Sequence, residues 1–357
     1  MAAIGIVIRE LIIGGAEKQC LLLAKALQAN HKVILIIQKD VGENNRNHVF
    51  IEENNIRTEL LKGNLLSRIR KTLKLIRKEK IELLITYLPI DNVLGGAVRL
   101  LNHKIKLIDG VRSSLLPGYK LIPNRWVSKY LAARTVFNNE SGLRSFTEKG
   151  YPKNKSVYIH NYTEINNEPP VRTSSKITRI ISVGRYIDAK DYKTAIWGIK
   201  NLSGHYPDGT IHYTIIGFGE LEKKIRQWIS ESGCNTISMV NNPDNLEAYY
   251  READIYLCSS VFEGLSNTLL EALEFGLPVV ATNVGDNYHL VQENITGFIV
   301  PAKDYHKIAE KLRMLVDSPE MRREFGVNGF KLLQRKFNKT LFTSRYEELI
   351  REVLNTS

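Results

Sequence analysis

Two glutamates, Glu263 and Glu271, lie eight residues apart in the segment FEGLSNTLLEALEFGLPVVATNVG (262–285). Glu263 falls on a predicted loop after an apolar strand, and Glu271 falls two turns into the helix that follows. Because apolar residues flank Glu271, a solvated helix face explains it poorly, and a carboxylate there could accept hydrogen bonds from both vicinal hydroxyls of a ribose. Backbone N–H groups at the start of the helix would suit phosphate oxygens, and they belong to Gly264, Leu265, Ser266 and Asn267. The alternative is a pair of capping or surface glutamates.

Two cations, Arg185 and Lys190, follow an apolar strand predicted at residues 178–184. The strand ends at Gly184, so both cations lie at the carboxyl edge of a sheet, where open α/β folds bind their ligands. Arg185 offers a planar fork of donors and Lys190 a point charge, and together they could hold a diphosphate. The alternative is a pair of solvated surface cations.

A glycine pair, Gly14 and Gly15, follows the first strand and opens a helix. Glycines there let the backbone approach a phosphate or a sugar, and the helix start adds N–H groups and a partial positive charge. A tight turn without a ligand would need the same residues.

The elements that must position these residues form two arrays of alternating strands and helices. The first array has predicted strands at 4–11, 32–38, 81–88, 104–109, 135–139 and 156–161. The second has strands at 178–184, 212–219, 254–260, 278–285 and 297–301, with helices near 191–202, 220–230 and 267–275. Apolar strands separated by helices indicate parallel sheets covered on both faces. The predicted fold is therefore α/β, with two Rossmann-like domains that face each other.

The polar segment 163–176 contains a proline pair and predicts a linker between these domains. We expect a first domain over residues 1–165 and a second over 175–337. The amphipathic C-terminal segment, about 338–357, predicts a helix that crosses back to the first domain.

The composition is that of a globular protein: 357 residues, 43% hydrophobic and 25% charged. Cys20, Cys234 and Cys258 share no metal-ligand spacing, which favours a reduced, cytoplasmic compartment. Arg9 and Glu10 interrupt the apolar start of the chain, so a signal peptide is not predicted. No run of about 18 apolar residues predicts a membrane span.

The net charge of +12 is concentrated in the first half, where residues 1–165 hold 27 Lys and Arg against 14 Asp and Glu. Segment 62–80 alone holds eight basic residues and one acidic residue, with an apolar stripe at Leu65, Leu66, Ile69, Leu73 and Ile76. Such a helix predicts contact with an anionic membrane surface. The alternative is a crossover helix that docks its stripe on the sheet and leaves its cations in water. Nucleic-acid binding would also fit the charge, but no recognisable motif or interleaved aromatics support it.

In their order along the chain, these motifs resemble the GT-B-fold retaining glycosyltransferases of family 4. The segment from Glu263 to Glu271 is similar to the family's E-x7-E motif. GGAE near the start, VGRYIDAK (183–190), IIGFGELE (215–222) and TGFIV (296–300) follow in the family's order. The resemblance covers essentially the whole chain and is sharpest over residues 178–300.

The resemblance implies a role for each candidate residue. Glu271 would hold the nucleotide ribose, and Glu263 would contact hydroxyls of the donor sugar. Arg185 and Lys190 would stabilise the diphosphate leaving group, a part that a metal plays in other sugar transferases. Gly15 would face the donor phosphates, and the nucleotide pocket would be lined by Gly217 and Gly219. Gly184, at the end of its strand, would also bind the donor. The sequence has no Asp-x-Asp motif and no His/Cys cluster, in keeping with the family's metal independence, so no metal or other cofactor is expected.

The sequence departs from the family at two places that contact the donor sugar. Many members have a histidine where this chain has KIKLIDGVRSS (104–114), which offers Asp109 and Arg112 instead. Arg112 is therefore a candidate donor-binding residue. The family's usual acidic residue after VGG is replaced around His289. Both departures leave the identity of the donor sugar open.

The predicted reaction moves a sugar, a hexose or an N-acetylhexosamine, from a nucleoside diphosphate to an acceptor. The resemblance implies UDP as the carrier and a lipid-linked saccharide of bacterial surface polysaccharide synthesis as the acceptor, at the inner face of the cell membrane. Retention would follow attack from the side on which the leaving group departs, although a covalent route is also open. A nucleotide-sugar 2-epimerase shares this architecture, but the E-x7-E segment and its VGR…K partner argue against it.

Overall fold

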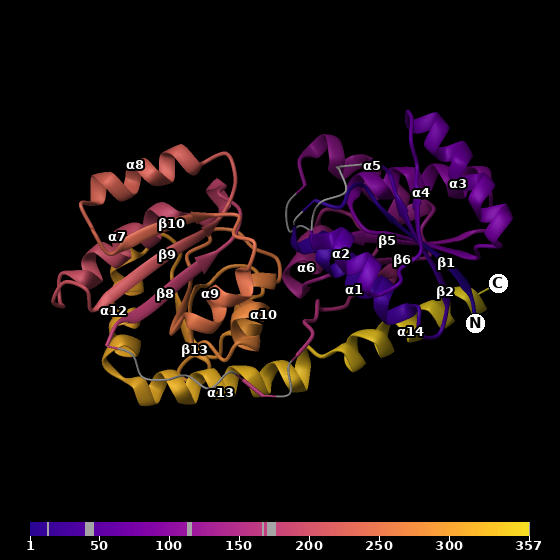
Figure 1. Ribbon diagram of the computed structural model, residues 1–357. Coiled ribbons are helices and arrows are strands. Elements are labelled where there is room, and N and C mark those ends of the chain that lie inside the picture. The colour runs from indigo at the N-terminus through magenta and orange to yellow at the C-terminus, as the bar shows by residue number, and fades with distance from the viewer. Residues whose placement is uncertain (13, 40–45, 113–115, 166–167, 170–175, 357) are drawn as a thin grey trace. The chain divides into compact units, whose positions relative to one another are not determined.

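The computed structural model describes residues 1–12, 14–39, 46–112, 116–165, 168–169 and 176–356 (Figure 1). The chain forms two compact units, each with its own sheet and core. Unit 1 comprises Met1–Tyr162 together with Lys339–Ser357, and unit 2 comprises Thr163–Asn338. More than half of the segment predicted as a linker, 163–176, lies outside the described residues.

Unit 1 is built on a sheet of seven parallel strands in the order β3-β2-β1-β4-β5-β6-β7. The strands are β1 (Ala3–Ile8), β2 (Lys32–Ile37), β3 (Thr58–Leu60), β4 (Leu83–Thr86), β5 (Lys106–Val111), β6 (Arg134–Phe137) and β7 (Ser156–Tyr158). The central strands are rich in Ile, Leu and Val and are buried because helices cover both faces.

Alternate strand residues of unit 1 divide its core into two layers. Val7, Ile34 and Leu84 pack with one layer of helices, which comprises α3 (Leu65–Glu79), α4 (Pro89–Leu101) and α5 (Gly118–Tyr130). Ile6 and Leu35 pack on the other side with α1 (Gly15–Leu27) and α14 (Lys339–Asn355). The described residues of the unit also form α2 (Arg46–Glu53), α6 (Glu140–Glu148) and a short 3-10 helix (Lys153–Lys155). In Figure 1, α14, in yellow, runs beside α1, in indigo.

Unit 2 repeats the plan with six parallel strands in the order β10-β9-β8-β11-β12-β13. They are β8 (Thr178–Val183), β9 (Ile211–Gly217), β10 (Ile237–Asn241), β11 (Ile255–Cys258), β12 (Val279–Thr282) and β13 (Gly297–Val300). One face carries α7 (Tyr192–Ser203), α8 (Glu222–Ser232) and α12 (Tyr305–Asp317). The other carries α9 (Leu246–Glu252), α10 (Asn267–Glu274) and α13 (Pro319–Lys336), and α11 (Asn287–Leu290) lies beside α10. The predicted α/β class with two parallel sheets is confirmed.

The C-terminal helix α14 belongs to unit 1 although it follows unit 2 in sequence. Its Phe342 ring lies 4.7 Å from that of Tyr162 and 4.9 Å from that of Tyr346. Nε2 of the His31 ring donates a hydrogen bond to Oε2 of Glu347 at 2.8 Å. The helix thus completes the core layer beside α1.

Candidate functional site

The strand order of unit 2 reverses at β8, which has β9 on one side and β11 on the other. The helices that follow β8 and β11, α7 and α10, cover opposite faces of the sheet. At such a point a crevice forms outside the carboxyl ends of the strands. Arg185 and Lys190 follow β8 and Glu263 follows β11, so all three lie at this switch point.

Lys190 and Glu263 form an ion pair at the switch point. Nζ of Lys190 lies 2.5 Å from Oε1 of Glu263, and the two side chains are only 18% and 13% exposed. Ser260 donates a hydrogen bond from Oγ to the same Oε1 at 2.8 Å. Arg185, in contrast, is exposed. The structure therefore joins two of the three residues predicted to be catalytic.

Hydrogen bonds to the backbone hold these two loops together. The N–H of Val261 donates to the carbonyl oxygen of Ala189 at 2.9 Å, and Oγ of Ser259 donates to that of Lys190 at 2.8 Å. Asp191, with φ of 43°, caps α7 with its side chain and so ends the turn that carries Lys190. Lys190 is thus fixed before a ligand arrives, which is what electrostatic preorganisation requires.

The charges at the switch point keep Lys190 a cation. Burial lowers the pKa of Lys190, but the charge of Glu263 and the hydrogen bond to it outweigh this effect, and the net pKa is raised. The charge of Arg185 acts to lower the pKa of Lys190, so the two cations share one electrostatic environment. Burial and the charge of Glu263 raise the pKa of the adjacent Cys258, and burial of this kind makes a thiol less reactive.

Three glycines predicted to bind the donor also have a packing role. A Cβ on Gly217 would lie 1.9 Å from the carbonyl oxygen of Gly184, and a Cβ on Gly184 would lie 2.9 Å from Cε of Lys190. Gly219 has φ of +149°, and a Cβ there would lie 2.7 Å from the carbonyl oxygen of Tyr186. The ends of β8 and β9 approach too closely for side chains, and this requirement is independent of any ligand.

Glu271 lies half-buried on α10, where its carboxylate is held by Tyr250 of α9. The Tyr250 hydroxyl donates to Oε2 of Glu271 at 2.9 Å, and its ring stacks on Phe275 with centroids 5.4 Å apart. Burial, and next the charge of Glu271, raise the pKa of Tyr250 well above its usual value, so the phenol remains a donor. Sequence reasoning missed Tyr250, whose only signal is its place in a short helix before β11.

Glu274, three residues further along α10, has a different partner. Its Oε2 accepts a hydrogen bond at 2.5 Å from Oγ1 of Thr163, the first residue of unit 2. The two glutamates that interrupt the apolar face of α10 are therefore not equivalent. Glu274 ties the start of unit 2 to the helix, whereas Glu271 is held by Tyr250 of α9.

The predicted phosphate-binding loop, Gly264 to Asn267, leads directly into α10, and its Leu265 and Ser266 are buried. The N–H of Asp286, in the loop after β12, donates to the carbonyl oxygen of Gly264 at 3.0 Å. Gly285 allows this approach, because it has φ of +56° and a Cβ there would lie 2.4 Å from the carbonyl oxygen of Glu263. Loops after three neighbouring strands are thus fixed against one another.

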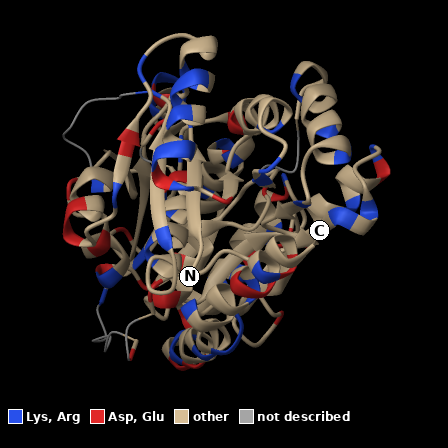
Figure 2. Ribbon diagram, turned by 90° about the vertical axis from the view of Figure 1, so that its right-hand side faces the viewer, with Lys and Arg blue, Asp and Glu red and all other residues tan. Residues whose placement is uncertain are grey.

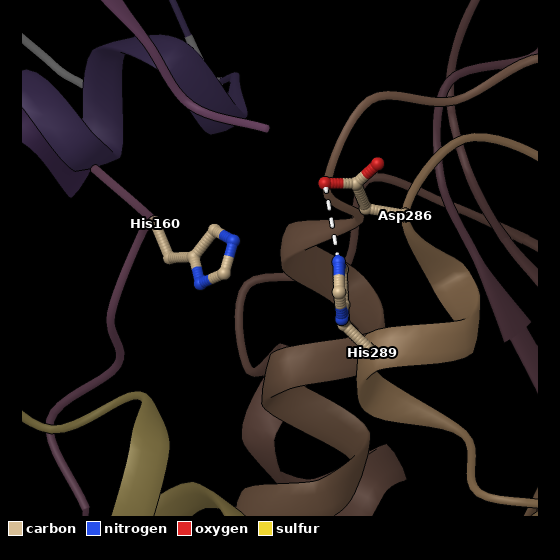
Figure 3. Close-up of side chains that lie close together, drawn as sticks. All are labelled: His160, Asp286 and His289. Atoms are coloured by element: carbon tan, nitrogen blue, oxygen red, sulfur yellow. Dashed lines mark ion pairs between the residues drawn. The ribbon is translucent and has the colours of Figure 1, made fainter. Parts of the chain in front are cut away.

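Asp286 and His289 lie together beside this loop. Asp286 is fully buried, and one of its carboxylate oxygens lies 3.9 Å from Nε2 of His289 (Figure 3). His160, also drawn there, belongs to unit 1. The sequence was predicted to depart from the family pattern around His289. The structure places the buried carboxylate of Asp286 one turn before this histidine, and sequence reasoning did not identify Asp286.

In unit 1, α1 begins at Gly15 after an extended Gly14. The mostly buried Glu17 lies against this helix start, and a Cβ on Gly14 would lie 2.3 Å from its Oε2. A carboxylate at that position complements the partial positive charge of the helix N-terminus. Donor phosphate contact at the glycine pair stays a prediction.

Arg112 follows β5 and lies over the ring of Tyr87, 4.1 Å from its centroid. Its Nη2 donates to the hydroxyl of Tyr346 on α14 at 2.8 Å. Nε and Nη1 of Arg112 are buried and have no hydrogen-bond partner within the described part of the chain. Arg112 thus helps to hold α14 on unit 1, and its predicted contact with the donor stays a prediction.

Two family models match consecutive parts of the chain. The model described as Glycosyltransferase Family 4 matches residues 13–166, and that described as Glycosyl transferases group 1 matches residues 164–332. The chain belongs to the group 1 glycosyltransferases. The predicted transferase class is confirmed, and the 2-epimerase alternative is not favoured.

Relatives and solved structures agree with this assignment. A 370-residue alignment at 25% identity covers 99% of this chain and all of the Campylobacter jejuni GalNAc-alpha-(1->4)-GalNAc-alpha-(1->3)-diNAcBac-PP-undecaprenol alpha-1,4-N-acetyl-D-galactosaminyltransferase. An uncharacterized glycosyltransferase of Haemophilus influenzae is 26% identical over 273 residues, which cover 73% of this chain and 74% of that protein. The fold matches Anabaena HepE, solved in complex with UDP-glucose, at a TM-score of 0.86 and 16% identity, covering 99% of this chain and 100% of that one.

Proposed function

We propose that this glycosyltransferase moves a hexose or an N-acetylhexosamine from a UDP-sugar to a lipid-linked saccharide, with retention at the anomeric carbon. The observation that carries the proposal is the fixed cation Lys190, paired with Glu263 at the switch point of unit 2. A group that leaves as a diphosphate needs such a cation, because negative charge develops on it during bond cleavage. The neighbouring loops supply the sugar and ribose contacts.

Two of the similar proteins support the choice of substrates. The solved HepE complex contains UDP-glucose, which favours a uracil nucleotide as the carrier. The Campylobacter relative acts on a saccharide linked to undecaprenol through a diphosphate, which favours a lipid-linked acceptor. On this basis we place the reaction in bacterial surface polysaccharide synthesis.

In the proposed reaction, Glu271 accepts hydrogen bonds from the ribose hydroxyls while Tyr250 fixes its carboxylate. Lys190 and Arg185 contact the diphosphate, and Glu263 contacts hydroxyls of the donor sugar and keeps Lys190 charged. The acceptor hydroxyl attacks from the side on which the diphosphate departs, and the departing phosphate takes its proton. The C–O bond to the acceptor then forms on the face where the bond to the diphosphate broke, which retains the configuration.

In this proposal Lys190 and Arg185, two cations on one loop, offset the charge of the diphosphate leaving group, and no divalent ion is needed. Turnover should therefore be unchanged when EDTA is added to an assay that contains no added metal. A loss of turnover with EDTA that Mg²⁺ or Mn²⁺ restores would contradict metal independence.

We further propose that the enzyme works at the inner face of the cell membrane, with the cations of segment 62–80 near anionic headgroups. Six Lys and Arg residues lie on the helix of this segment, α3. Within the described residues, no helix has the length and apolar character needed to cross a bilayer. Contact through a charged surface is the kind of association that such a helix supports.

Calorimetric titration with UDP, GDP and ADP tests the donor assignment, followed by Glu271→Gln with the nucleotide that binds. Loss of a charged acceptor for the ribose should weaken binding by about tenfold or more, since such hydrogen bonds contribute about 1.5–3 kcal/mol. Glu247→Gln on the neighbouring helix α9, whose side chain is exposed and pairs with Arg251, is the matched control. Equal affinities for the native enzyme and Glu271→Gln would remove Glu271 from the site.

A further inference from the structure

Helix α5 has an unusual distribution of side chains. Its outward face carries Tyr119, Ile122, Trp126 and Tyr130, which are 75%, 61%, 47% and 59% exposed. Its fully buried residues are Asn124, Val127 and Ser128. Two of these three are polar, so the helix buries polar side chains and exposes its aromatic ones, the reverse of an ordinary surface helix.

Buried hydrogen bonds fix α5 in this orientation. Oδ1 of Asn124 accepts from Nδ2 of Asn92 on α4 at 2.8 Å. Oγ of Ser128 donates to Oδ2 of Asp109 on β5 at 2.5 Å and accepts from Oγ1 of Thr135 at 3.0 Å. Rotating the helix to bury its aromatic rings would leave these groups unpaired in the core, which costs more than each bond contributes. The aromatic face is therefore held outward.

Lysines accompany the exposed rings. Nζ of Lys129 lies 5.2 Å from the centroid of Tyr130, and Nζ of Lys120 lies 5.6 Å from that of Tyr119. The rings of Trp126 and Tyr130 lie 5.7 Å apart. Trp and Tyr with flanking Lys are enriched at the boundary between lipid headgroups and acyl chains, where rings enter the boundary and ammonium groups reach phosphates.

The other two helices of this layer also expose apolar side chains. Leu65 and Leu66 on α3, and Leu100 and Leu101 on α4, are exposed. Helices α3, α4 and α5 hold ten Lys and Arg residues; Figure 2 colours the Lys and Arg residues of the chain blue.

The acidic side chains of this layer point inward. Helices α3, α4 and α5 contain two carboxylates, Glu79 and Asp91, and both are buried. Glu79 pairs with Arg57 and Lys32, and Asp91 accepts a hydrogen bond from Gln38. The outward face of these described helices is therefore apolar and cationic, without an exposed carboxylate.

We infer that α5 inserts its aromatic face into the headgroup boundary of an anionic phospholipid bilayer, while the cations of α3 lie on the phosphates. The inference deepens the proposed membrane location and rests on it, but it does not depend on donor or acceptor identity. A bilayer fits this surface better than a protein partner does, because protein interfaces are depleted in lysine. An anionic bilayer also complements the charge.

Co-sedimentation of the full chain with vesicles of phosphatidylglycerol and phosphatidylcholine tests the inference. The double substitution Trp126→Ser and Tyr130→Ser should weaken partition by about tenfold or more, because both rings would lose the apolar area that insertion removes from water. Ile295→Ser, at a side chain of unit 2 that is 49% exposed, is the matched control and should leave partition unchanged. All of these side chains face solvent, so the variants should keep the melting temperature of the native chain.

A second measurement reports insertion directly. The chain has three tryptophans, and Trp197→Phe with Trp228→Phe leaves Trp126 as the single tryptophan, whose emission is then followed. With anionic vesicles its emission should shift to the blue and be quenched by brominated acyl chains. Vesicle binding without quenching would overturn insertion through α5 and leave a contact by charge alone.

Two further outcomes separate this inference from its alternatives. If the full chain self-associates in sedimentation velocity without lipid, and Trp126→Ser with Tyr130→Ser abolishes that association but not vesicle binding, the face is a protein interface and the inference is wrong. UDP affinity measured on the same double variant should equal that of the native enzyme. If brominated acyl chains quench Trp126 but the native enzyme binds no nucleotide, the membrane inference is supported and the donor proposal is wrong.

Discussion

The two units share a parallel-sheet plan, yet they differ in whether their functional cations are buried or exposed. In unit 2 the cation that matters is mostly buried and paired, since Lys190 lies 2.5 Å from Glu263 and is tied to its loop through the backbone. In unit 1 most cations of α3 and α5 are exposed, while the carboxylates of the same layer are buried.

This difference separates two uses of positive charge. A fixed and partly desolvated cation acts on charge that develops at one place in a transition state, and it is screened little by salt. An array of exposed cations attracts an extended anionic surface, and its effect falls within a Debye length. Substitutions in the two units should therefore affect different measurements.

The largest effect is expected from Lys190→Ala, which removes the fixed cation of unit 2. Turnover should fall by roughly 10²–10³-fold, as when one preorganised group for developing charge is lost. The kcat of UDP-sugar transfer or hydrolysis is the measurement. Lys193→Ala, on the first turn of α7, is the control, and partition on anionic vesicles should stay unchanged in both variants. Normal turnover in Lys190→Ala would remove the diphosphate role.

The next effect tests unit 1 through Arg70, Lys74, Arg77 and Lys78, all exposed on α3. Replacing the four with Ser should weaken vesicle partition by about 10² or more, since each cation near an anionic surface contributes about 1 kcal/mol. Partition of the native enzyme should also fall as salt rises from 50 to 500 mM. Turnover on a water-soluble acceptor analogue should not change. Equal partition of variant and native enzyme would mean that these cations only keep the helix solvated.

The two units also differ in the partners of their buried carboxyl groups. Glu263 faces a lysine, whereas Asp109 at the core of unit 1 accepts from Ser128 and its Oδ1 has no hydrogen-bond partner among the residues that the structure describes. Burial raises the pKa of Asp109 to about 6. The folded state therefore binds this proton more tightly than the unfolded chain, in which the pKa is near 3.9.

The contribution of Asp109 to stability is thus fully present below about pH 4 and is lost as the pH rises through about 6. The shift corresponds to about 3 kcal/mol in the free energy of unfolding of unit 1. Asp109→Asn should remove this pH dependence, measured by urea unfolding between pH 4.5 and 7.5, and it should stabilise the unit at pH 7.5. Asp208→Asn, at an exposed site, is the control. An identical pH profile for Asp109→Asn and the native enzyme would show that Asp109 ionises normally.

Much of this arrangement could be predicted from the sequence. The apolar segments 32–38 and 178–184 became β2 and β8 because interior strands of a parallel sheet are apolar throughout. The positions of Lys190 and Glu263 at strand ends followed from the same pattern. Strand β3, in contrast, has only three residues, of which Thr58 and Glu59 are exposed, so it carries no apolar run that sequence reasoning could detect.

The contacts that tune the site could not be predicted, because they join residues far apart in sequence. Tyr250 meets Glu271 across 21 positions, and Arg112 meets Tyr346 across 234. Neither contact produces a repeating pattern in the amino-acid sequence from which it could be predicted. The inward Asn124 and Ser128 of α5 could not be predicted for the same reason, because Asn124 meets Asn92 across 32 positions and Ser128 meets Asp109 across 19.

The smallest effect should come from Tyr250→Phe, which removes only the hydroxyl that holds Glu271. The stacked ring remains, so the fold should be unaffected, and the affinity for UDP should fall by about fivefold, in line with about 1 kcal/mol for one hydrogen bond. Calorimetric titration with UDP measures this loss. In a double-mutant cycle with Glu271→Gln, the two losses should not add, because Tyr250 acts through Glu271. Additive losses would mean that Tyr250 contacts the nucleotide itself. The hydrogen bond from Tyr250 would then not explain how the carboxylate of Glu271 is positioned for the ribose.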